Sequence, residues 1–483
     1  MGMMLGNGSI DSTSCRTING TPIGPCPYPA RIRESNTAIR SASRLDRWLL
    51  RTRGYRRMLV DPVSQALGKN GVGIGKPGLG SVAGPSWKGP EGVGFSAVAQ
   101  STSMSGDRDP KEATAGRGPA GGSVVEAATS IDLRIPKTMR ALVKARPEAG
   151  AELREVPVPH PGPGEVLIRL EAVSLCGTDL HIYRWDPWAQ GRLGGKLPRI
   201  FGHEMAGRVV AHGPGTGAVP LGTRVAAETH LVDWTCYQCR TGREHVCANL
   251  RILGVDADGA FAEYMVLPER NAWPSPGLEP EIAAIQEPMG NAVFATFVEE
   301  ITTASVAVLG CGPIGLMAVA ICRFAGASRV FATDVMPHRR EMAARMGADC
   351  VLDPAATDVV AEIRRETDGT GVDVVLEMSG AEAAIHQAFE ICTNGGRVSL
   401  LGLPSRPVTL DLNNAIIFRG LRVYGITGRQ LWGTWYKTAA LLREGLDVSP
   451  IITHRLPLAR YAEAFDLLAE GVAGKVVLLP QES

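Results

Sequence analysis

The sequence lacks any run of about 18 apolar residues, the minimum that a helix needs to cross a bilayer. It also lacks an excess of charge of one sign, because 50 Lys and Arg stand against 49 Asp and Glu and the net charge is +1. A chain so balanced has no global field that would recruit nucleic acid or a membrane surface. We therefore expect no transmembrane helix, no nucleic-acid partner and no membrane partner.

Cysteine is too sparse for a disulfide scaffold, at ten in 483 residues. Three of the ten cluster as Cys236, Cys239 and Cys247, which indicates metal binding in a reducing, cytoplasmic compartment. The length is sufficient for two or three domains, and a hydrophobic content of 45% is sufficient to fill their cores. The composition therefore predicts a globular protein with metal-binding thiols.

Residues 1–136 show neither helical nor strand periodicity for long, and Gly, Ser, Pro and Arg dominate them. Such a segment buries too little apolar area to offset its chain entropy, so we expect a disordered leader. One part of it, residues 41–60, could form a basic amphipathic helix. The first sixty residues hold ten Arg and no Lys against three acidic residues. This composition is also typical of a mitochondrial transit peptide, which stays open as an alternative.

From Arg140 onward the sequence changes to short strands. MRALVK, GEVLIRLEAVSLC and GHEMAGRVVAHG alternate or run apolar over short spans that Pro and Gly interrupt. Residues 159–165, PHPGPGE, are typical of a turn. An irregular β-rich domain is therefore predicted over residues 137–294.

A dinucleotide-binding pattern follows. A buried strand, SVAVLG, leads into a turn with Gly310, Gly312 and Gly315 at the spacing G-x-G-x-x-G, and then into an apolar helix. The next strand, RVFATDV, ends on Asp334. A glycine motif alone is weak evidence, but the whole series predicts the Rossmann fold. Strands and helices continue to alternate, which predicts a parallel sheet and an α/β domain over residues 295–429.

The glycines of this turn allow the backbone to approach a pyrophosphate, whose charge lies at the helix N-terminus. Asp334 is expected to accept hydrogen bonds from the adenosine ribose. Its negative charge would repel the extra phosphate of NADP, so NAD is the expected cofactor. Arg339 lies nearby in the sequence and complicates this choice, because an arginine can hold a phosphate.

Cys176, His203 and Glu204 supply a thiolate, an imidazole and a carboxylate, which are all zinc ligands. A catalytic zinc takes three protein ligands and keeps one position open for a substrate oxygen. Each of these residues alone is more typical of a core position. Their association with a cysteine cluster and a dinucleotide motif favours a catalytic zinc site.

A second metal site is indicated in VDWTCYQCRTGREHVC, where Asp233, Cys236, Cys239 and Cys247 have the spacing D-x2-C-x2-C-x7-C. Three cysteines at this spacing favour metal over coincidence. The carboxylate is a harder ligand than the thiolates and should weaken a zinc site. A structural zinc and a lobe held by packing alone both stay open.

Together, CGTDLHIYRWDPWAQ, FGHEMAG, EPMGNAV and GITGR resemble the zinc-dependent medium-chain dehydrogenases, and among them those that act on L-threonine. The resemblance covers about residues 137–481. It implies a GroES-like catalytic domain at 137–294, completed by residues 430–483, and a homotetramer. In this family the first position of the cysteine lobe is normally Cys, so Asp233 is a departure. Family members begin near Met139, so residues 1–136 could also be upstream sequence translated from a misplaced start.

The resemblance also implies a role for several residues. Zinc acts as a Lewis acid on a substrate hydroxyl, while NAD accepts the hydride. Thr178 takes the hydroxyl proton, and His181 passes it through the cofactor ribose towards solvent. Glu287 matches an acid near the zinc, and His230 matches a position that shapes substrate preference. Cofactor contacts are implied for Gly310, Gly312, Ile314, Gly315, Asp334, Arg339, Leu401, Gly402, Leu403, Ile426 and Thr427.

The implied reaction is oxidation of the β-hydroxyl of L-threonine to L-2-amino-3-oxobutanoate. Because threonine is a zwitterion, its pocket must satisfy both an ammonium and a carboxylate. Asp179, Glu228 and His230 are candidates for this, with Trp185 and Trp188 as an apolar wall. Asp179 and Glu228 could equally support the zinc ligands.

Two other functions compete with this one. A polyol or diol dehydrogenase, acting on sorbitol or 2,3-butanediol, is the alternative within the family. A non-catalytic NAD-binding protein on the same fold is the alternative outside it. Loss of the metal ligands would indicate the latter, and Cys176, His203 and Glu204 are all present.

Overall fold

The computed structural model describes residues 134–482. The predicted leader, apart from its last three residues, lies outside this range, and so do the amphipathic helix and the transit-peptide and misplaced-start alternatives. Within the described range, no helix is long and apolar enough to cross a membrane.

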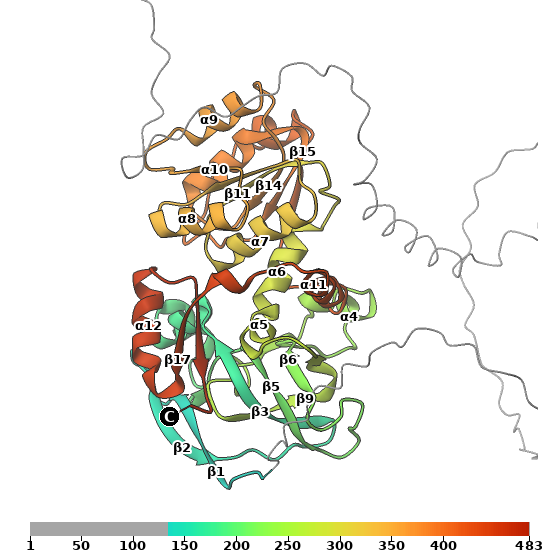
Figure 1. Ribbon diagram of the computed structural model, residues 1–483, viewed down its shortest axis with the longest axis vertical. Coiled ribbons are helices and arrows are strands. Elements are labelled where there is room, and N and C mark those ends of the chain that lie inside the picture. Colours follow the sequence, from blue (N-terminus) through green and yellow to red (C-terminus); the bar gives the residue numbers. More distant parts are fainter. Residues whose placement is uncertain (1–133, 483) are drawn as a thin grey trace, which may run out of the picture. The chain divides into compact units, whose positions relative to one another are not determined.

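One lobe of the described chain is β-rich and takes strands from both ends of the described range. Its strands are β1 (Thr138–Lys144), β2 (Glu152–Pro157), β3 (Glu165–Ser174), β4 (Arg199–Ile200), β5 (Glu204–His212), β6 (Arg224–Ala227), β7 (His230–Leu231), β8 (Arg251–Ile252), β9 (Tyr264–Pro268), β10 (Ala272–Pro274), β17 (Ile452–Pro457) and β18 (Lys475–Leu479). The largest sheet has the order β10-β6-β5-β3-β18-β17, with β9 also paired to β3 (Figure 1). A three-stranded sheet, β2-β1-β4, and the pair β7-β8 complete the lobe.

The helices of this lobe are short. They are α2 (Gly177–Arg184), α3 (Pro187–Leu193), α4 (Tyr237–Arg240), α5 (Pro280–Ala284), α6 (Gln286–Thr296), α11 (Gly433–Arg443) and α12 (Tyr461–Glu470), with the 3₁₀ turns η2 (Glu244–Val246), η3 (Glu269–Asn271), η5 (Ser449–Ile451) and η6 (Leu458–Arg460). Helix α3 begins after Asp186, whose side chain accepts a hydrogen bond from the amide of Ala189, and Pro187 occupies its first turn. Both features favour helix initiation at this point.

The C-terminal segment joins the β-rich lobe through β18. This strand pairs antiparallel with β3, so that Val477 lies opposite Ser174 and Leu478 opposite Val173. On α12, Phe465 stacks on Tyr183 of α2, with ring centroids 4.1 Å apart. The last strand therefore lies beside the end of β3, from which the metal-ligand segment continues.

The dinucleotide lobe contains a six-stranded sheet. Its elements are β11 (Ser305–Leu309), α7 (Pro313–Phe324), β12 (Arg329–Thr333), α8 (Pro337–Arg345), β13 (Cys350–Leu352), α9 (Val359–Glu366), β14 (Val372–Glu377), α10 (Glu382–Ile391), β15 (Cys392–Leu400), the π-helical turn η4 (Asn413–Ile417) and β16 (Arg422–Gly425). The strand order is β13-β12-β11-β14-β15-β16, and every pairing is parallel. This is the doubly wound order of the Rossmann fold, as predicted.

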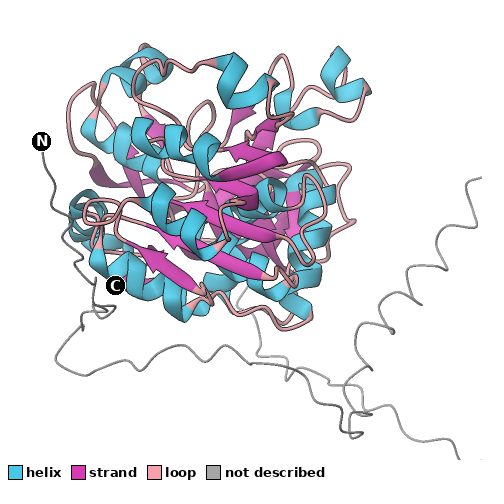
Figure 2. Ribbon diagram, turned by 90° about the horizontal axis from the view of Figure 1, so that it is seen from above, coloured by secondary structure: helices cyan, strands magenta, loops and turns pink. Residues whose placement is uncertain are grey.

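Helices cover both faces of this sheet, as Figure 2 shows. Val306 and Val308 of β11 belong to the apolar cluster that contains α7. Ala307 and Leu309 of the same strand belong to a second cluster, with α9 and α10. Successive side chains of a strand point to opposite faces, so a fully apolar strand is expected where both faces are covered. The run SVAVL therefore reflects burial on two sides.

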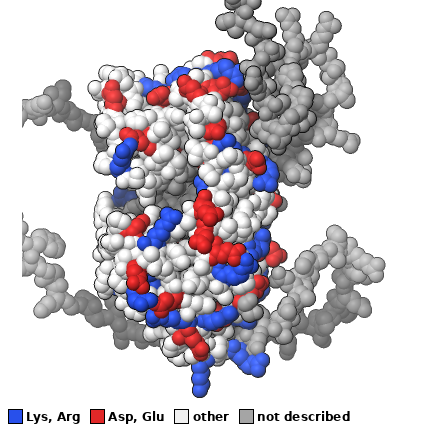
Figure 3. All heavy atoms as spheres, turned by 90° about the vertical axis from the view of Figure 1, so that its left-hand side faces the viewer, with Lys and Arg blue, Asp and Glu red and all other residues white. Residues whose placement is uncertain are grey.

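Acidic and basic side chains are interspersed on the face shown in Figure 3. No extended field of one sign is visible over the described residues of that face.

Candidate active site and cofactor pocket

Cys176, His203 and Glu204 lie together at the ends of two neighbouring strands. Cys176 follows β3 and caps α2, while Glu204 begins β5 directly after His203. One ligand atom from each residue lies within 4.8 Å of those of the other two. His203 and Glu204 are buried, and Cys176 is half-buried. Because β3 and β5 are paired strands, the sheet itself brings the three donors together.

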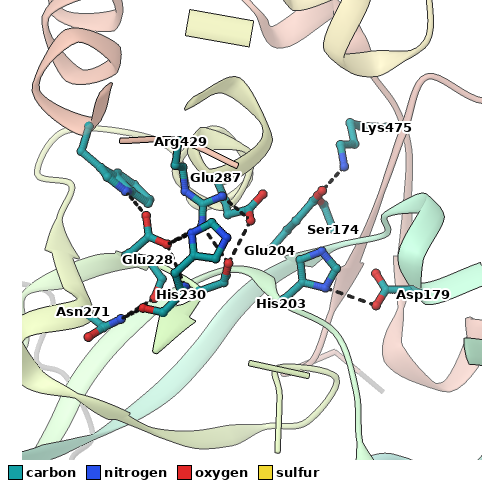
Figure 4. A network of polar contacts seen from close by, with 12 residues as sticks. Ser174, Asp179, His203, Glu204, Glu228, His230, Asn271, Glu287, Arg429 and Lys475 are labelled. Atoms are coloured by element: carbon teal, nitrogen blue, oxygen red, sulfur yellow. Dashed lines mark hydrogen bonds and ion pairs between the residues drawn. The ribbon is translucent and has the colours of Figure 1, made fainter. Parts of the chain in front are cut away.

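Asp179 lies behind two of these residues. Its Oδ1 is 3.5 Å from His203 Nδ1 (Figure 4). Its Oδ2 accepts a hydrogen bond of 2.9 Å from the amide of Cys176. Burial alone would lower the pKa of His203, but the Asp179 carboxylate raises it well above its ordinary value. A carboxylate at one ring nitrogen orients a histidine and leaves the other nitrogen for a metal. Asp179 therefore contacts two of the predicted metal ligands, as a residue that supports them would.

The Glu204 carboxylate is divided between two environments. Its Oε2 accepts hydrogen bonds from Lys475 Nζ and Ser174 Oγ. Its Oε1 is buried and has no hydrogen-bond partner among the described residues. Burial raises the pKa of Glu204, and the neighbouring Lys475 opposes that rise. Buried polar atoms normally have a partner, and Glu204 Oε1 has none within the described range. A zinc ion bound together with Cys176 and His203 would be a suitable partner for this oxygen.

Thr178 and His181 lie on α2, three residues apart and therefore on one face. The His181 side chain is 55% exposed, and its Nδ1 is hydrogen-bonded to Asp186. The ring lies 5.8 Å from that of Trp188, centroid to centroid. His181 thus lies at the boundary with solvent, where a proton relay would have to end. Asp186 is a partner that the sequence alone did not identify.

A buried charged network lies beside the metal group (Figure 4). Arg429 donates through Nη1 to Glu287 Oε1 at 2.7 Å and through Nη2 to Glu228 Oε1 at 2.6 Å. It also donates to Thr229 Oγ1, which donates to Glu287 Oε1. Arg429 and Glu228 are at most 1% exposed. The network therefore combines two carboxylates with one guanidinium, shielded from water.

His230 belongs to the same network. Its amide donates to Glu228 Oε1 at 2.8 Å, and its Nδ1 lies 3.0 Å from that oxygen. The indole of Trp435 donates to Glu228 Oε2 at 2.6 Å. Burial opposes ionisation of Glu228, but Arg429 and His230 hold its pKa at about 2. Both oxygens of Glu228 are therefore engaged, and this residue supports its neighbours.

Gly428 explains how His230 is accommodated. It has a φ of +56°, and a Cβ at this position would collide with the His230 ring. Both the backbone conformation and the space therefore require glycine. Arg429 follows directly, so GITGR places a cation in the network and a glycine against its histidine. The motif is part of the family resemblance, but nothing in the sequence indicates a role for Arg429, Lys475 or Trp435.

The cysteine lobe brings its four predicted ligands together as well. One donor atom from each of Asp233, Cys236, Cys239 and Cys247 lies within 4.8 Å of the others. Cys236 Sγ is 3.5 Å from Cys239 Sγ and 3.7 Å from Cys247 Sγ. Three thiols converging in this way fit a zinc ion.

The Asp233 carboxylate already has other partners. Its Oδ1 accepts hydrogen bonds from the amides of Cys236 and Thr235, at 2.9 and 2.8 Å, and its Oδ2 accepts one from Asn249. The bond from the Cys236 amide, followed by that from Asn249, holds the pKa of Asp233 well below its ordinary value. Asp233 therefore shapes the loop that carries the cysteines, whether or not it also binds metal.

A pocket of about 420 Å³ lies at the carboxyl ends of β11 and β12, where Gly310, Gly312, Asp334 and Arg339 line it. Gly310 has a φ of +95°, and a Cβ there would lie 2.7 Å from that of Ser379. The order of the sheet reverses at β11, where dinucleotides bind in such folds. The glycine turn thus provides the cradle that a pyrophosphate requires.

Asp334 follows β12 directly, one residue beyond its predicted place at the strand end. Its two oxygens accept hydrogen bonds of 2.8 Å from the amides of Cys311 and Met336. Arg339 Nη1 lies 3.9 Å from Asp334 Oδ2, and its Nη2 donates to the Gly471 carbonyl. The carboxylate is therefore fixed at the edge of the pocket.

The other predicted cofactor contacts lie outside the lining of this pocket. Leu403 is 90% exposed, Thr427 is exposed and Ile426 is buried. Ile314 packs against the core, and Gly315 lies so close to the Gly310 carbonyl that a side chain would collide with it. Leu401 and Gly402 follow β15 and are half-buried.

A doubly wound dinucleotide lobe, joined to a β-rich lobe that carries a Cys–His–Glu metal group, defines a zinc-dependent dehydrogenase. Residues 162–277 match the alcohol dehydrogenase GroES-like domain, and residues 313–444 match the zinc-binding dehydrogenase family. The chain belongs to this zinc-binding alcohol dehydrogenase family and is an enzyme, as predicted.

Individual proteins similar to this chain are also dehydrogenases. L-threonine 3-dehydrogenase from Pyrococcus horikoshii is 51% identical over 344 residues, which are 71% of this chain and 98% of that protein. A zinc-binding dehydrogenase from Sinorhizobium meliloti, bound to NADP, is 31% identical, with a TM-score of 0.66 over 71% of this chain and 100% of that one. An alcohol dehydrogenase from Escherichia coli, complexed with NADH, is 27% identical, with a TM-score of 0.65 over the same shares.

Proposed function

We propose that this enzyme oxidises the β-hydroxyl of L-threonine to L-2-amino-3-oxobutanoate, with NAD as hydride acceptor. The observation that carries the proposal is the 51% identity to the threonine dehydrogenase of Pyrococcus horikoshii over 98% of its length. The intact group of Cys176, His203 and Glu204 supports it.

Cys176, His203 and Glu204 would hold a zinc ion, which would act as a Lewis acid on the substrate hydroxyl. The chain supplies the route for the proton. Thr178 Oγ1 would accept this proton as it gives up its own, and His181 would pass the released proton on towards solvent. Because Asp186 holds His181 Nδ1, the atom left to accept a proton is Nε2.

We assign recognition of the substrate ammonium to the buried network of Arg429, Glu228 and Glu287. Two carboxylates meet one guanidinium in this network, and the second carboxylate favours a substrate ammonium. Both oxygens of Glu228 are already engaged. The hydrogen bonds that Glu287 accepts from Arg429 and Thr229 go to its Oε1. We therefore assign the ammonium to Glu287 Oε2, beside His230.

Asp334 is the reason for choosing NAD. Its carboxylate is fixed at the edge of the pocket by two backbone amides, and it would repel a phosphate on the ribose. Solved relatives occur with NADP and with NADH, so the family alone does not decide between them. The proposed metal content is one catalytic zinc and a second, weaker zinc at the lobe of Asp233.

The dinucleotide sheet offers a surface for self-association into the proposed homotetramer. Strand β16 is its edge, and Val423 on this strand is 37% exposed. Ile417 and Phe418 nearby in the chain are 63% and 78% exposed. An unpaired strand edge flanked by apolar side chains pairs readily with a second copy. Light scattering of the Phe418→Asp variant should then show smaller assemblies.

Free thiols in both metal groups also suit a cytoplasmic enzyme.

Steady-state NADH production tests the activity. Zinc-loaded protein should oxidise L-threonine far better than L-serine, whose alcohol is primary, and better than sorbitol or 2,3-butanediol. The variant His230→Ala should lower kcat/KM for threonine more than for the uncharged diol. Faster turnover of sorbitol or the diol than of threonine would contradict the proposal and favour a polyol or diol dehydrogenase.

A further inference from the structure

Lys475 is a buried cation that the proposed mechanism does not use. It is the first residue of β18 and is 3% exposed, while Glu204 beside it is fully buried. Its Nζ contacts Glu204 Oε2 and donates to the carbonyl of Leu175 at 2.9 Å. Leu175 is the residue before Cys176. One ammonium thus holds a predicted metal ligand and the backbone that carries another (Figure 4).

The contacts of Glu204 are strongly asymmetric. Lys475 Nζ and Ser174 Oγ both donate to Oε2, whereas Oε1 has no partner within the described part of the chain. A carboxylate can bind zinc through one oxygen or through both. With Oε2 engaged by two donors, Oε1 is the oxygen that remains for the metal.

We propose that Lys475 is a positioning residue that holds Glu204 to one-oxygen coordination of the catalytic metal. This keeps a fourth position open for the substrate, which a two-oxygen carboxylate would crowd. The inference rests on the proposed metal site, but it concerns the geometry of that site and is independent of the substrate.

The charge of Lys475 does not by itself predict tighter metal binding, because a cation repels zinc. Lys475 therefore does not act by attracting the metal. Its effect on the site comes from holding the Glu204 carboxylate in one orientation. Removing the ammonium frees Oε2 to turn towards the metal. Ser174 still donates one hydrogen bond to that oxygen, so loss of the serine hydroxyl should have the weaker effect.

Cobalt(II) in place of zinc tests this directly. Four-coordinate cobalt absorbs visible light more strongly than five-coordinate cobalt, so its spectrum reports coordination without any turnover. The spectrum of the cobalt-loaded Cys176→Ser variant is subtracted, which removes the contribution of the cysteine lobe. Absence of a difference between wild type and Cys176→Ser would mean that the proposed catalytic metal site itself is wrong.

If wild type and Cys176→Ser differ, the cobalt-loaded Lys475→Met protein should absorb visible light less strongly than wild type. Lys475→Arg keeps a buried cationic donor and should retain the wild-type absorption. Thermal melting of each loaded protein shows whether it is folded. Should Lys475→Met not fold, Ser174→Ala provides the same test through the second donor and should show a smaller loss. A folded Lys475→Met protein with the wild-type spectrum would overturn the proposal. Where Lys475→Met does not fold, a wild-type spectrum of Ser174→Ala would overturn it.

Discussion

Replacement of Arg429 by Met should destabilise the protein more than most single substitutions. The guanidinium is 1% exposed and joins Glu287, Glu228 and Thr229 through hydrogen bonds of 2.6 to 2.7 Å. Met keeps the apolar stem and removes every donor. Two carboxylates then remain buried with no guanidinium to pair with them.

Two independent arguments give the size of the effect. Removing one partner of a buried ion pair costs about 3 to 5 kcal/mol. The pKa of Glu228, held at about 2 against an ordinary 4.5, corresponds to about 3 kcal/mol at 1.36 kcal/mol for each pKa step. We therefore expect the free energy of unfolding to fall by about 3 kcal/mol near neutral pH, where Glu228 is ionised.

The pH dependence of this loss follows from the direction of the pKa shift. Because the folded pKa of Glu228 lies below the unfolded one, its contribution is present in full above pH 4.5. It is lost as the pH falls from 4.5 towards 2. The stability gap between wild type and Arg429→Met should therefore be widest near neutral pH and should narrow below pH 4.5.

Urea denaturation of zinc-free protein measures this gap without a contribution from metal release. Arg429→Lys is the matched control, since it keeps the charge but loses the fork that bridges both carboxylates, and its deficit should be smaller. A Met variant within about 1 kcal/mol of wild type near neutral pH, well below the range for a broken buried ion pair, would refute the reasoning.

Two further predictions concern the cofactor and the lobe. Asp334→Ser should raise the KM for NAD and lower the preference for NAD over NADP, because ribose contacts and phosphate repulsion are removed together; a wild-type enzyme that prefers NADP would contradict this role. Asp233→Ala should lower both the zinc content measured by elemental analysis and the melting temperature, while Asn249→Ala should affect the melting temperature more than the zinc. Unchanged zinc and stability in Asp233→Ala would show that this lobe is not a metal site.

The fold was accessible from the sequence because its signals are local. The run SVAVL, apolar on both faces, predicts a strand covered by helices, and the spacing of Gly310, Gly312 and Gly315 predicts the turn that follows it. Asp334 could be placed for a similar reason, since it comes directly after the next strand. These features depend on residues within a few positions of one another.

The candidate metal ligands could also be chosen, because the family pattern that carries them is strong. Their surroundings could not be derived in this way. Asp179 and Glu228 were both candidates for the substrate ammonium. The structure places Asp179 behind His203 and engages both oxygens of Glu228, and that difference depends on contacts across strands.

By itself, the sequence determined the glycine turn and the cysteine spacing of the lobe, because each of these lies within a few positions of the chain, and the family resemblance added the donors Cys176, His203 and Glu204. Only the tertiary structure decided which charges meet. Lys475 lies 271 positions from Glu204, and Arg429 lies 201 positions from Glu228. No periodicity or spacing rule connects residues so far apart. Such pairs form because burial leaves each charge in need of an opposite partner, and the packed strands determine which partner is within reach.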